Sequence, residues 1–203
     1  MEKPGQSPET AEINQPKEIF LEIGGGLDSA AINGNRSFEG NKIYIGVDAA
    51  RGNYHTQDRQ DYGEAVRAET ADMHQQIQHE KPDENIHFIF AEGEHLPLPN
   101  DSVQEVYMAN VVTAPLTHNA RTDLLLDVNR VLLPDGKLVL KVNWDVWMWP
   151  KEEIKQIIEA AGFGQCEIID SMTDEANFVQ LETTYGASAG IDTPTGYFVT
   201  ATK

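Results

Sequence analysis

A short apolar run that stops at three consecutive glycines constrains this chain more than any other feature. Residues 19–23 read Ile-Phe-Leu-Glu-Ile, and Gly24, Gly25 and Gly26 follow at once. This order, with an Ala-containing segment next, predicts a buried strand, a tight turn and a helix. Glycine lets the backbone approach a ligand closely, and a helix start directs unpaired N–H groups and the positive end of its dipole toward that ligand. We therefore expect a nucleotide-like ligand at this turn.

The glycine turn by itself fits two classes of ligand. Gly24-x-Gly26-x-x-Ser29 is an incomplete dinucleotide fingerprint, which alone is a weak signal. Glu22 lies two residues before the first glycine and gives the different pattern Glu-x-Gly-x-Gly. An ordinary glycine turn after a buried strand is a third interpretation, so the choice depends on the rest of the chain.

Two later segments also predict strands that end in an acid. Residues 42–48 and 85–92 are apolar and rich in β-branched or aromatic residues, and they end in Asp48 and Glu92. If these strands are parallel and adjacent, Glu22, Asp48 and Glu92 share the sheet edge where open α/β sheets bind ligands. A carboxylate there accepts both ribose hydroxyls, each hydrogen bond contributing roughly 1.5–3 kcal/mol. A helix cap or turn acid is the alternative for Asp48.

Composition limits the partners. The 203 residues, 40% of them hydrophobic, suit one domain with a sizeable core. The net charge of -18, with only 15 Lys and Arg, disfavours nucleic acid. No apolar stretch approaches the roughly 20 residues that span a bilayer, so no membrane partner is expected. Cys166 is the single cysteine, which favours the cytoplasm, and the polar residues 1–17 predict a flexible N-terminal leader.

Taken together, the motifs resemble those of the class I, Rossmann-like, S-adenosylmethionine-dependent methyltransferases over roughly residues 18–203. The pattern Glu-x-Gly-x-Gly at 22–26 is similar to the first motif of that family. Residues 92–103 are similar to its acid-Ala-x-x-Leu-Pro-Phe-x-Asp-x-Ser-Phe segment, and residues 127–140 to its Glu-x-x-Arg-Val-Leu-x-Pro-Gly-Gly-x-Leu segment. Ala-Gly-Phe at 161–163 resembles the end of a late family helix.

The resemblance implies one doubly wound α/β domain over residues 18–203, with a seven-stranded, mostly parallel sheet and an antiparallel last strand. It implies S-adenosylmethionine as cofactor and in-line methyl transfer to a small molecule or peptide, with proximity lowering the barrier by up to about 7–11 kcal/mol. Glu92 would accept from the adenine amino group. No metal is expected, because the histidines lack metal-ligand spacing. The implied cofactor-binding residues are Glu22, Gly24, Gly25, Gly26, Asp48, Ala49, Glu92, Gly93 and Asn110.

Some positions keep alternatives open. His118 falls where many family members carry a histidine and is a candidate general base, or else a helix-capping or surface residue. Trp144, Trp147 and Trp149 line a substrate pocket, pack on the sheet or form an interface between copies, so a homodimer is left open. Asp28 replaces the third glycine of the first motif, where it would pair with the ammonium of the cofactor or repel its carboxylate.

Asp28 and the acidity of the chain therefore leave a second function open: a catalytically inactive methyltransferase-like protein that binds a partner. A third is an NAD(P)-binding oxidoreductase. Glu22 and the Leu-Pro-Leu-Pro segment at 96–99 weigh against the oxidoreductase. Because proteins of one fold can have any of these functions, the function must be argued from the residues of the site.

Overall fold

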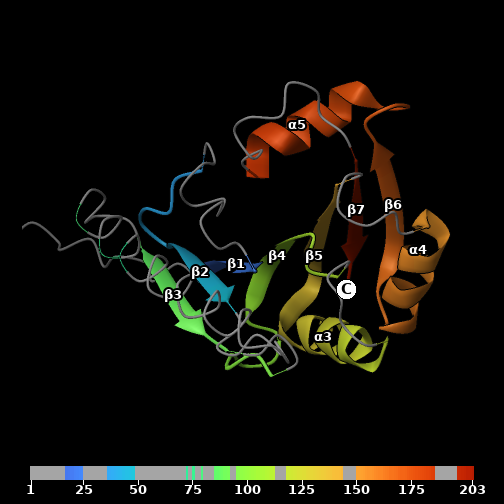
Figure 1. The fold of residues 1–203 in the computed structure, drawn as a ribbon. Coiled ribbons are helices and arrows are strands. Elements are labelled where there is room, and N and C mark those ends of the chain that lie inside the picture. The colour runs from blue at the N-terminus through green and yellow to red at the C-terminus, as the bar shows by residue number, and fades with distance from the viewer. Residues whose placement is uncertain are drawn as a thin grey trace, which may run out of the picture.

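The computed structural model describes the chain in seven segments, to which three single helical residues, Asp72, Gln75 and His79, are added (Figure 1). The segments are 17–24, 36–48, 85–91, 95–112, 118–143, 150–185 and 196–203. The strands are β1 (Glu18–Ile23), β2 (Lys42–Asp48), β3 (Ile86–Phe90), β4 (Val103–Ala109), β5 (Leu132–Val142), β6 (Gly164–Asp170) and β7 (Tyr197–Thr202). The helices are α3 (His118–Val131), α4 (Lys151–Ala160) and α5 (Glu175–Tyr185).

All seven strands form one sheet in the order β3-β2-β1-β4-β5-β7-β6. The first five strands pair in parallel, and β7 is antiparallel to both β5 and β6. The predicted fold class is therefore confirmed. Because the chain passes from β1 to β2 and β3 on one side and then returns to β4 on the other, the strand order reverses between β1 and β4. That reversal marks the topological switch point, where sheets of this kind bind ligands.

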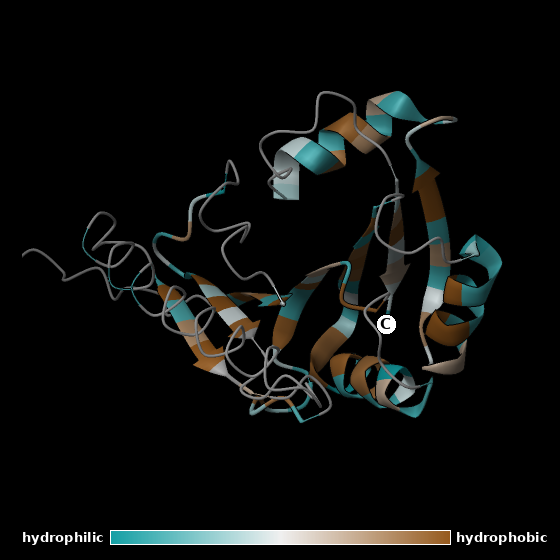
Figure 2. Ribbon diagram, viewed as in Figure 1, coloured by the Kyte–Doolittle hydropathy of each residue, from teal (hydrophilic) through white to brown (hydrophobic). Residues whose placement is uncertain are grey.

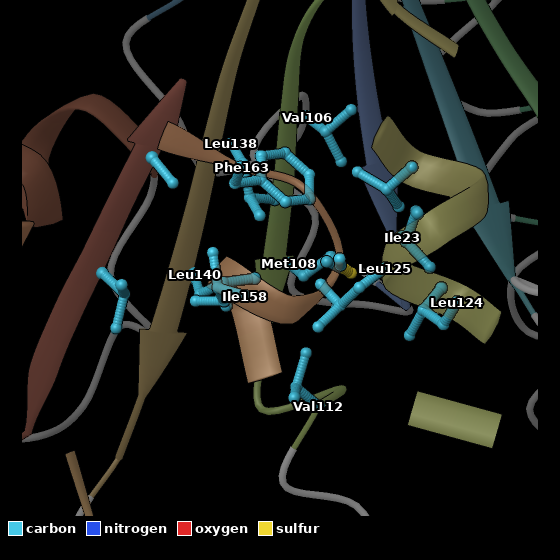
Figure 3. Packing of buried hydrophobic residues seen from close by; sticks show 14 of the residues in the cluster. Ile23, Val106, Met108, Val112, Leu124, Leu125, Leu138, Leu140, Ile158 and Phe163 are labelled. Carbon is cyan, nitrogen blue, oxygen red and sulfur yellow. The ribbon is translucent and has the colours of Figure 1, made fainter. Parts of the chain in front are cut away.

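One face of the sheet is covered by α3 and α4 and is mainly aliphatic (Figure 2). Strand side chains alternate between faces, so Ile23, Met108 and Leu140 share this face, and Figure 3 shows them packed with Leu125 and Ile158 from the helices. The helices contribute residues at helical spacing. These are Leu124, Leu125, Val128 and Val131 in α3, and Ile154, Ile157 and Ile158 in α4.

The opposite face is mainly aromatic and is covered in part by α5. The rings of Tyr107 on β4 and Tyr185 on α5 stack with their centroids 4.7 Å apart, and those of Phe178 and Phe198 lie 5.1 Å apart. An ion pair with N–O distance 2.6 Å also joins the buried Lys141 of β5 to the half-buried Glu182 of α5. The buried members of this aromatic face are Phe20, Phe38, Tyr44, Ile86, Tyr107, Val139, Ile169, Phe178, Tyr185 and Phe198.

Two element boundaries differ from expectation. The sequence predicts a helix over 123–133 and a strand from residue 137, whereas α3 begins at His118 and β5 begins at Leu132. Val103 pairs with Leu132 and Glu105 with Lys137, so the residues Pro134-Asp-Gly136, expected to turn the chain between helix and strand, form an irregularity inside one long strand. The predicted short helix at 27–32 lies outside the described residues. Among the described residues, no helix is long and apolar enough to cross a bilayer.

Candidate functional site

Gly24, the first residue of the glycine turn, lies between the ends of β2 and β4. Gly24 follows β1 with a φ of +72°, a left-handed conformation that disfavours side chains. Its N–H donates to the carbonyl of Val47 on β2 at 2.8 Å. A Cβ at Gly24 would come within 2.5 Å of a methyl carbon of Val111, which follows β4. Two independent constraints, the backbone angle and this close approach, therefore require glycine at the switch point.

The acid at the end of β2 comes next to this turn. Ile23 pairs with Val47, so Asp48 is the strand residue adjacent to Gly24. Asp48 in turn pairs with Phe90, the last residue of β3. The predicted parallel alignment of the first three strands is thus confirmed, and it brings their carboxyl ends to one edge.

Glu22 is a buried acid at this edge, with 1% of its surface exposed. Its Oε2 accepts a 2.7 Å hydrogen bond from the hydroxyl of Tyr44 on β2. Tyr107 of β4 pairs with Glu22 of β1 in the sheet. Burial raises the pKa of the Tyr107 hydroxyl far above its ordinary value, and the negative charges of Glu22 and Glu182 raise it further. A carboxylate is rarely buried unless hydrogen bonds hold it, so this arrangement marks a candidate functional position.

Asn110 joins the carboxyl ends of β4 and β5. Its φ is +57°, in the left-handed region that asparagine tolerates better than most residues. Its N–H donates to the carbonyl of Lys141 at 2.9 Å, and its side-chain oxygen accepts from the N–H of Asn143 at 2.9 Å. This pair of contacts fixes the first residue after β4 to the end of β5.

His118, the candidate base, is the exposed first residue of α3. Its carbonyl accepts a 3.1 Å hydrogen bond from the Thr122 hydroxyl one turn later. Nearby, Arg121 donates from Nε to the carbonyl of Val112 at 2.8 Å, which ties the start of α3 to the segment after β4. His118 therefore lies exposed at the start of α3, and its role as a base stays a prediction.

The structure describes four of the predicted cofactor-binding residues. Glu22, Gly24, Asp48 and Asn110 lie at or next to the carboxyl ends of β1, β2 and β4. Several other predicted residues lie outside the described residues. These are Gly25, Gly26, Asp28, Ala49, Glu92, Gly93, Trp144, Trp147 and Trp149. In the described part of the chain, no group of three His, Cys, Asp or Glu side chains is arranged to hold a metal ion.

Sequence reasoning missed the polar partners on the aromatic face. The strand pattern identifies Tyr44 only as a strand residue, although its phenol holds Glu22. Lys141 interrupts the apolar run of β5 and is buried, with its ammonium paired to Glu182. A charged residue inside an apolar strand was the available signal for Lys141. No comparable signal identified Tyr44, because its role depends on the register between two strands.

A cavity of about 290 Å³ lies at the opposite edge of the sheet, near the amino ends of β1, β2 and β4. Arg36, one of the two cations that line it, is already engaged: Nη2 is 3.1 Å from Oε2 of Glu105, and the guanidinium carbon is 4.4 Å from the ring centroid of Phe20. Ligands of open α/β sheets bind at the carboxyl ends, so this cavity is not the candidate site. It is lined by Glu18, Ile19, Phe20, Arg36, Ser37, Phe38, Lys42, Gln104 and Glu105.

Comparison with known proteins identifies the class of fold. No family model matches the sequence, and no curated protein matches it significantly. An S-adenosylmethionine-dependent methyltransferase from Aquifex aeolicus superposes with a TM-score of 0.55 and 15% identity, over 92% of this chain and 83% of that chain. Phosphoethanolamine N-methyltransferase 2 of Haemonchus contortus, in complex with S-adenosyl-L-methionine, gives 0.54 and 14%, over 93% and 49%.

The chain thus has the Rossmann-like α/β fold of class I S-adenosylmethionine-dependent methyltransferases. It spans about half the length of the Haemonchus protein. The [4+2]-cyclase SpnF shares the fold with a TM-score of 0.57 and 17% identity, over 93% of this chain and 75% of that chain. Because a cyclase has the same fold, the reaction must be argued from the site.

Proposed function

We propose that the protein binds S-adenosylmethionine and transfers its methyl group to a small molecule or peptide. One observation carries the proposal. Gly24, which follows β1, is hydrogen-bonded to the end of β2, beside Asp48 and two residues after the buried carboxylate of Glu22. This combination of a close-approach turn and acids at a switch point suits a ligand with ribose hydroxyls and a positive charge.

Each residue has a role in this proposal. Asp48 accepts hydrogen bonds from the ribose hydroxyls, and Glu92 accepts from the adenine amino group. Gly24, with Gly25 and Gly26, lets the backbone pass close to the amino-acid end of the cofactor. When bound, S-adenosylmethionine supplies an electrophilic methyl group on a positively charged sulfur.

Glu22 and Asn110 support the proposed site through their own contacts. The Tyr44 hydroxyl keeps the Glu22 carboxylate in one position, so its negative charge supports a cationic ligand. Asn110 fixes the chain that leaves β4, beside which the methyl acceptor would bind. His118 takes a proton from the acceptor where its nucleophile carries one of high pKa. Most of the rate acceleration comes from holding acceptor and methyl group together.

Calorimetric titration with S-adenosylhomocysteine tests the proposal. The wild type is expected to bind, and Asp48→Ala to weaken binding by about tenfold or more, or roughly 1.4 kcal/mol. Glu18→Ala is the matched control, because Glu18 is an exposed acid at the amino end of β1. It should leave the affinity unchanged. Absence of both heat and thermal shift with the wild type would refute cofactor binding.

The same titration separates the other functions. Binding of NADH in place of S-adenosylhomocysteine would support the oxidoreductase interpretation of the glycine turn. No affinity for either ligand, together with a stable complex isolated from cell extract, would favour a partner-binding protein. Asp28 motivates that alternative, since it places a charge where the first motif usually has glycine.

A further inference from the structure

The cavity at the amino ends of β1, β2 and β4 opens on the aromatic face of the sheet. Glu18 precedes Phe20 of that face by two residues, and Lys42 precedes Tyr44 of the same face by two. Because side chains alternate between the faces of a strand, Glu18 and Lys42 share the aromatic face. The volume of about 290 Å³ is near the lower limit of the roughly 300–1,000 Å³ range of small-molecule sites. The cavity therefore suits a ligand of few atoms.

One acid and one base line this cavity without a partner of opposite charge. Glu18 pairs with Lys42 in the sheet, on neighbouring strands about 4.7–4.9 Å apart. Both residues are exposed. Among the residues that the structure describes, neither side chain has an ion-pair or hydrogen-bond partner, and the two form no ion pair with each other. The cavity thus presents one carboxylate and one ammonium that a ligand can engage.

The other two charges of the cavity are engaged with each other. Nη2 of Arg36 is 3.1 Å from Oε2 of Glu105, and Oε1 of Glu105 accepts a 2.5 Å hydrogen bond from the hydroxyl of Tyr185. The guanidinium carbon of Arg36 lies 4.4 Å from the ring centroid of Phe20 and 5.1 Å from that of Tyr185. A guanidinium held by a carboxylate and two rings is a fixed part of the wall. Among the described lining residues, Glu18 and Lys42 therefore supply the charges open to a ligand.

An apolar patch completes the lining. Phe20 and Phe38 both line the cavity, and their ring centroids are 5.8 Å apart. Covering these rings with an apolar group is favourable, because it removes apolar surface from water. The complementary ligand carries an ammonium, a carboxylate and an apolar side chain. Such a zwitterion has no net charge, so the net charge of -18 on the protein does not repel it.

We infer that this cavity binds a small apolar α-amino acid. The ammonium of the ligand pairs with Glu18, its carboxylate pairs with Lys42, and its side chain lies against the two phenylalanine rings. The site is separate from the proposed cofactor site, because it lies at the amino ends of strands whose carboxyl ends lead to Gly24 and Asp48. Binding of the amino acid here requires neither the cofactor nor methyl transfer. The same separation makes Glu18 a suitable control in the cofactor titration.

An NMR titration with L-leucine tests this site. The amide signals of Ser37 and Lys42, which line the cavity, should shift and saturate in the low millimolar range or below. Two probes remove one charge each from the same carbon skeleton: 4-methylpentanoate lacks the ammonium, and 3-methylbutan-1-amine lacks the carboxylate. Each probe should bind about fivefold more weakly than L-leucine or worse, since both charged partners in the protein are exposed to water.

Two variants assign the charges. Glu18→Gln should abolish the preference for L-leucine over 4-methylpentanoate, and Lys42→Gln should abolish the preference for L-leucine over 3-methylbutan-1-amine. Both positions are exposed, so the urea midpoints should change little. Glu39→Gln and Lys17→Gln are the matched controls, because they make the same charge changes at exposed residues outside the described lining of the cavity. Both preferences should survive in these controls.

Three outcomes would overturn the site. Shifts that do not saturate in the wild type would mean that the cavity does not hold L-leucine. Equal affinities for L-leucine and 4-methylpentanoate would mean that the ammonium of the ligand is not recognised. Shifts at Gly24 in place of Ser37 and Lys42 would place L-leucine at the candidate cofactor site. Failure of the wild type to bind S-adenosylhomocysteine would refute the proposed function alone, because the titration with L-leucine contains no cofactor.

Discussion

The phenol of Tyr44 on β2 donates a 2.7 Å hydrogen bond to the carboxylate of Glu22 on β1. Both side chains are almost fully buried, with exposed fractions of 0% and 1%. Tyr44 pairs with Phe20, so it reaches Glu22 diagonally across two parallel strands. A buried charge is tolerated only where such bonds hold it, and this bond therefore links the stability of the sheet to the candidate site.

Tyr44→Phe is expected to lower the free energy of unfolding and to weaken the binding of S-adenosylhomocysteine. Removing a hydrogen bond to a charged group costs about 1.5–3 kcal/mol, and the carboxylate loses its fixed orientation. Urea unfolding measures the first effect and calorimetry the second.

Tyr185→Phe is the matched control for Tyr44→Phe. Tyr185 donates a 2.5 Å hydrogen bond to Glu105, the same chemical pair at the other edge of the sheet. This variant should also be destabilised while keeping its ligand affinity. Equal weakening of ligand binding in both variants would mean that Tyr44 has no special link to the site.

Gly24→Ala should be destabilised by two separable effects. The left-handed backbone at φ +72° costs about 1–2 kcal/mol with a side chain, and the new Cβ would lie 2.5 Å from a Val111 methyl carbon. Adding Val111→Ala should recover only the second part. Urea midpoints of the single and double variants measure the partition.

Gly40→Ala isolates the backbone contribution. Gly40 has a φ of +67°, and a Cβ added there would meet no other atom within 4 Å, so the substitution strains the backbone alone. The double variant Gly24→Ala/Val111→Ala and the single variant Val111→Ala differ in free energy of unfolding by the cost of Gly24→Ala without the contact. Gly40→Ala should lower the free energy of unfolding by about that same difference. If Gly24→Ala lowers the free energy of unfolding no more than Gly40→Ala does, the contact with Val111 adds nothing to the cost of a side chain at Gly24.

The main strands and the switch point were predictable because they depend on local pattern. The predicted strand 42–48 has the observed bounds of β2, since it is a β-branched and apolar segment with clear ends. The first glycine motif and the acid of β2 are close in sequence to the strands that carry them. Their relative position then follows from the rule that parallel strands end at one edge.

Features that depend on tertiary contacts were not predictable. α5 buries only Phe178 and Tyr185 fully, and its other positions include Thr183 and Thr184, so residues 171–192 gave no clear helical pattern. Contacts with the aromatic face favour a helix over residues 175–185. Likewise, Asp135 adopts a φ of +65° where the resembling family has glycine. Aspartate tolerates that conformation better than most residues, so the turn survives the change.

Asn110 should tolerate aspartate better than alanine or glycine. Asn110→Asp keeps an acceptor for the Asn143 N–H, and aspartate also accommodates a φ of +57°. Asn110→Gly keeps the backbone and loses the acceptor, at about 1 kcal/mol. Asn110→Ala adds backbone strain of about 1–2 kcal/mol to that loss. Urea unfolding should rank the variants in this order, and equal stability of the alanine and glycine variants would contradict the role of the backbone angle.

Asp170 gives the fold a dependence on pH. Its carboxylate accepts from the Lys151 ammonium and, at 2.7 Å, from the N–H of Met172. Burial acts to raise the pKa of Asp170, but the hydrogen bonds from Lys151 and Met172 and the Lys151 charge outweigh it, so the pKa is lowered from 3.8. The folded pKa is below the unfolded one, so this contribution is complete above pH 3.8 and is lost as the pH falls through the folded value.

We therefore predict that Asp170→Asn lowers the urea midpoint near neutral pH and that its difference from the wild type shrinks below about pH 4. Glu167→Gln on the same strand is the control, because Glu167 is exposed and should show little difference at any pH. The Lys151 ammonium pairs with Asp170 from the start of α4, so the same loss should loosen α4 from β6. A difference for Asp170→Asn that stays constant from neutral to acidic pH would contradict the lowered pKa, since it would mean that proton uptake is the same in both states.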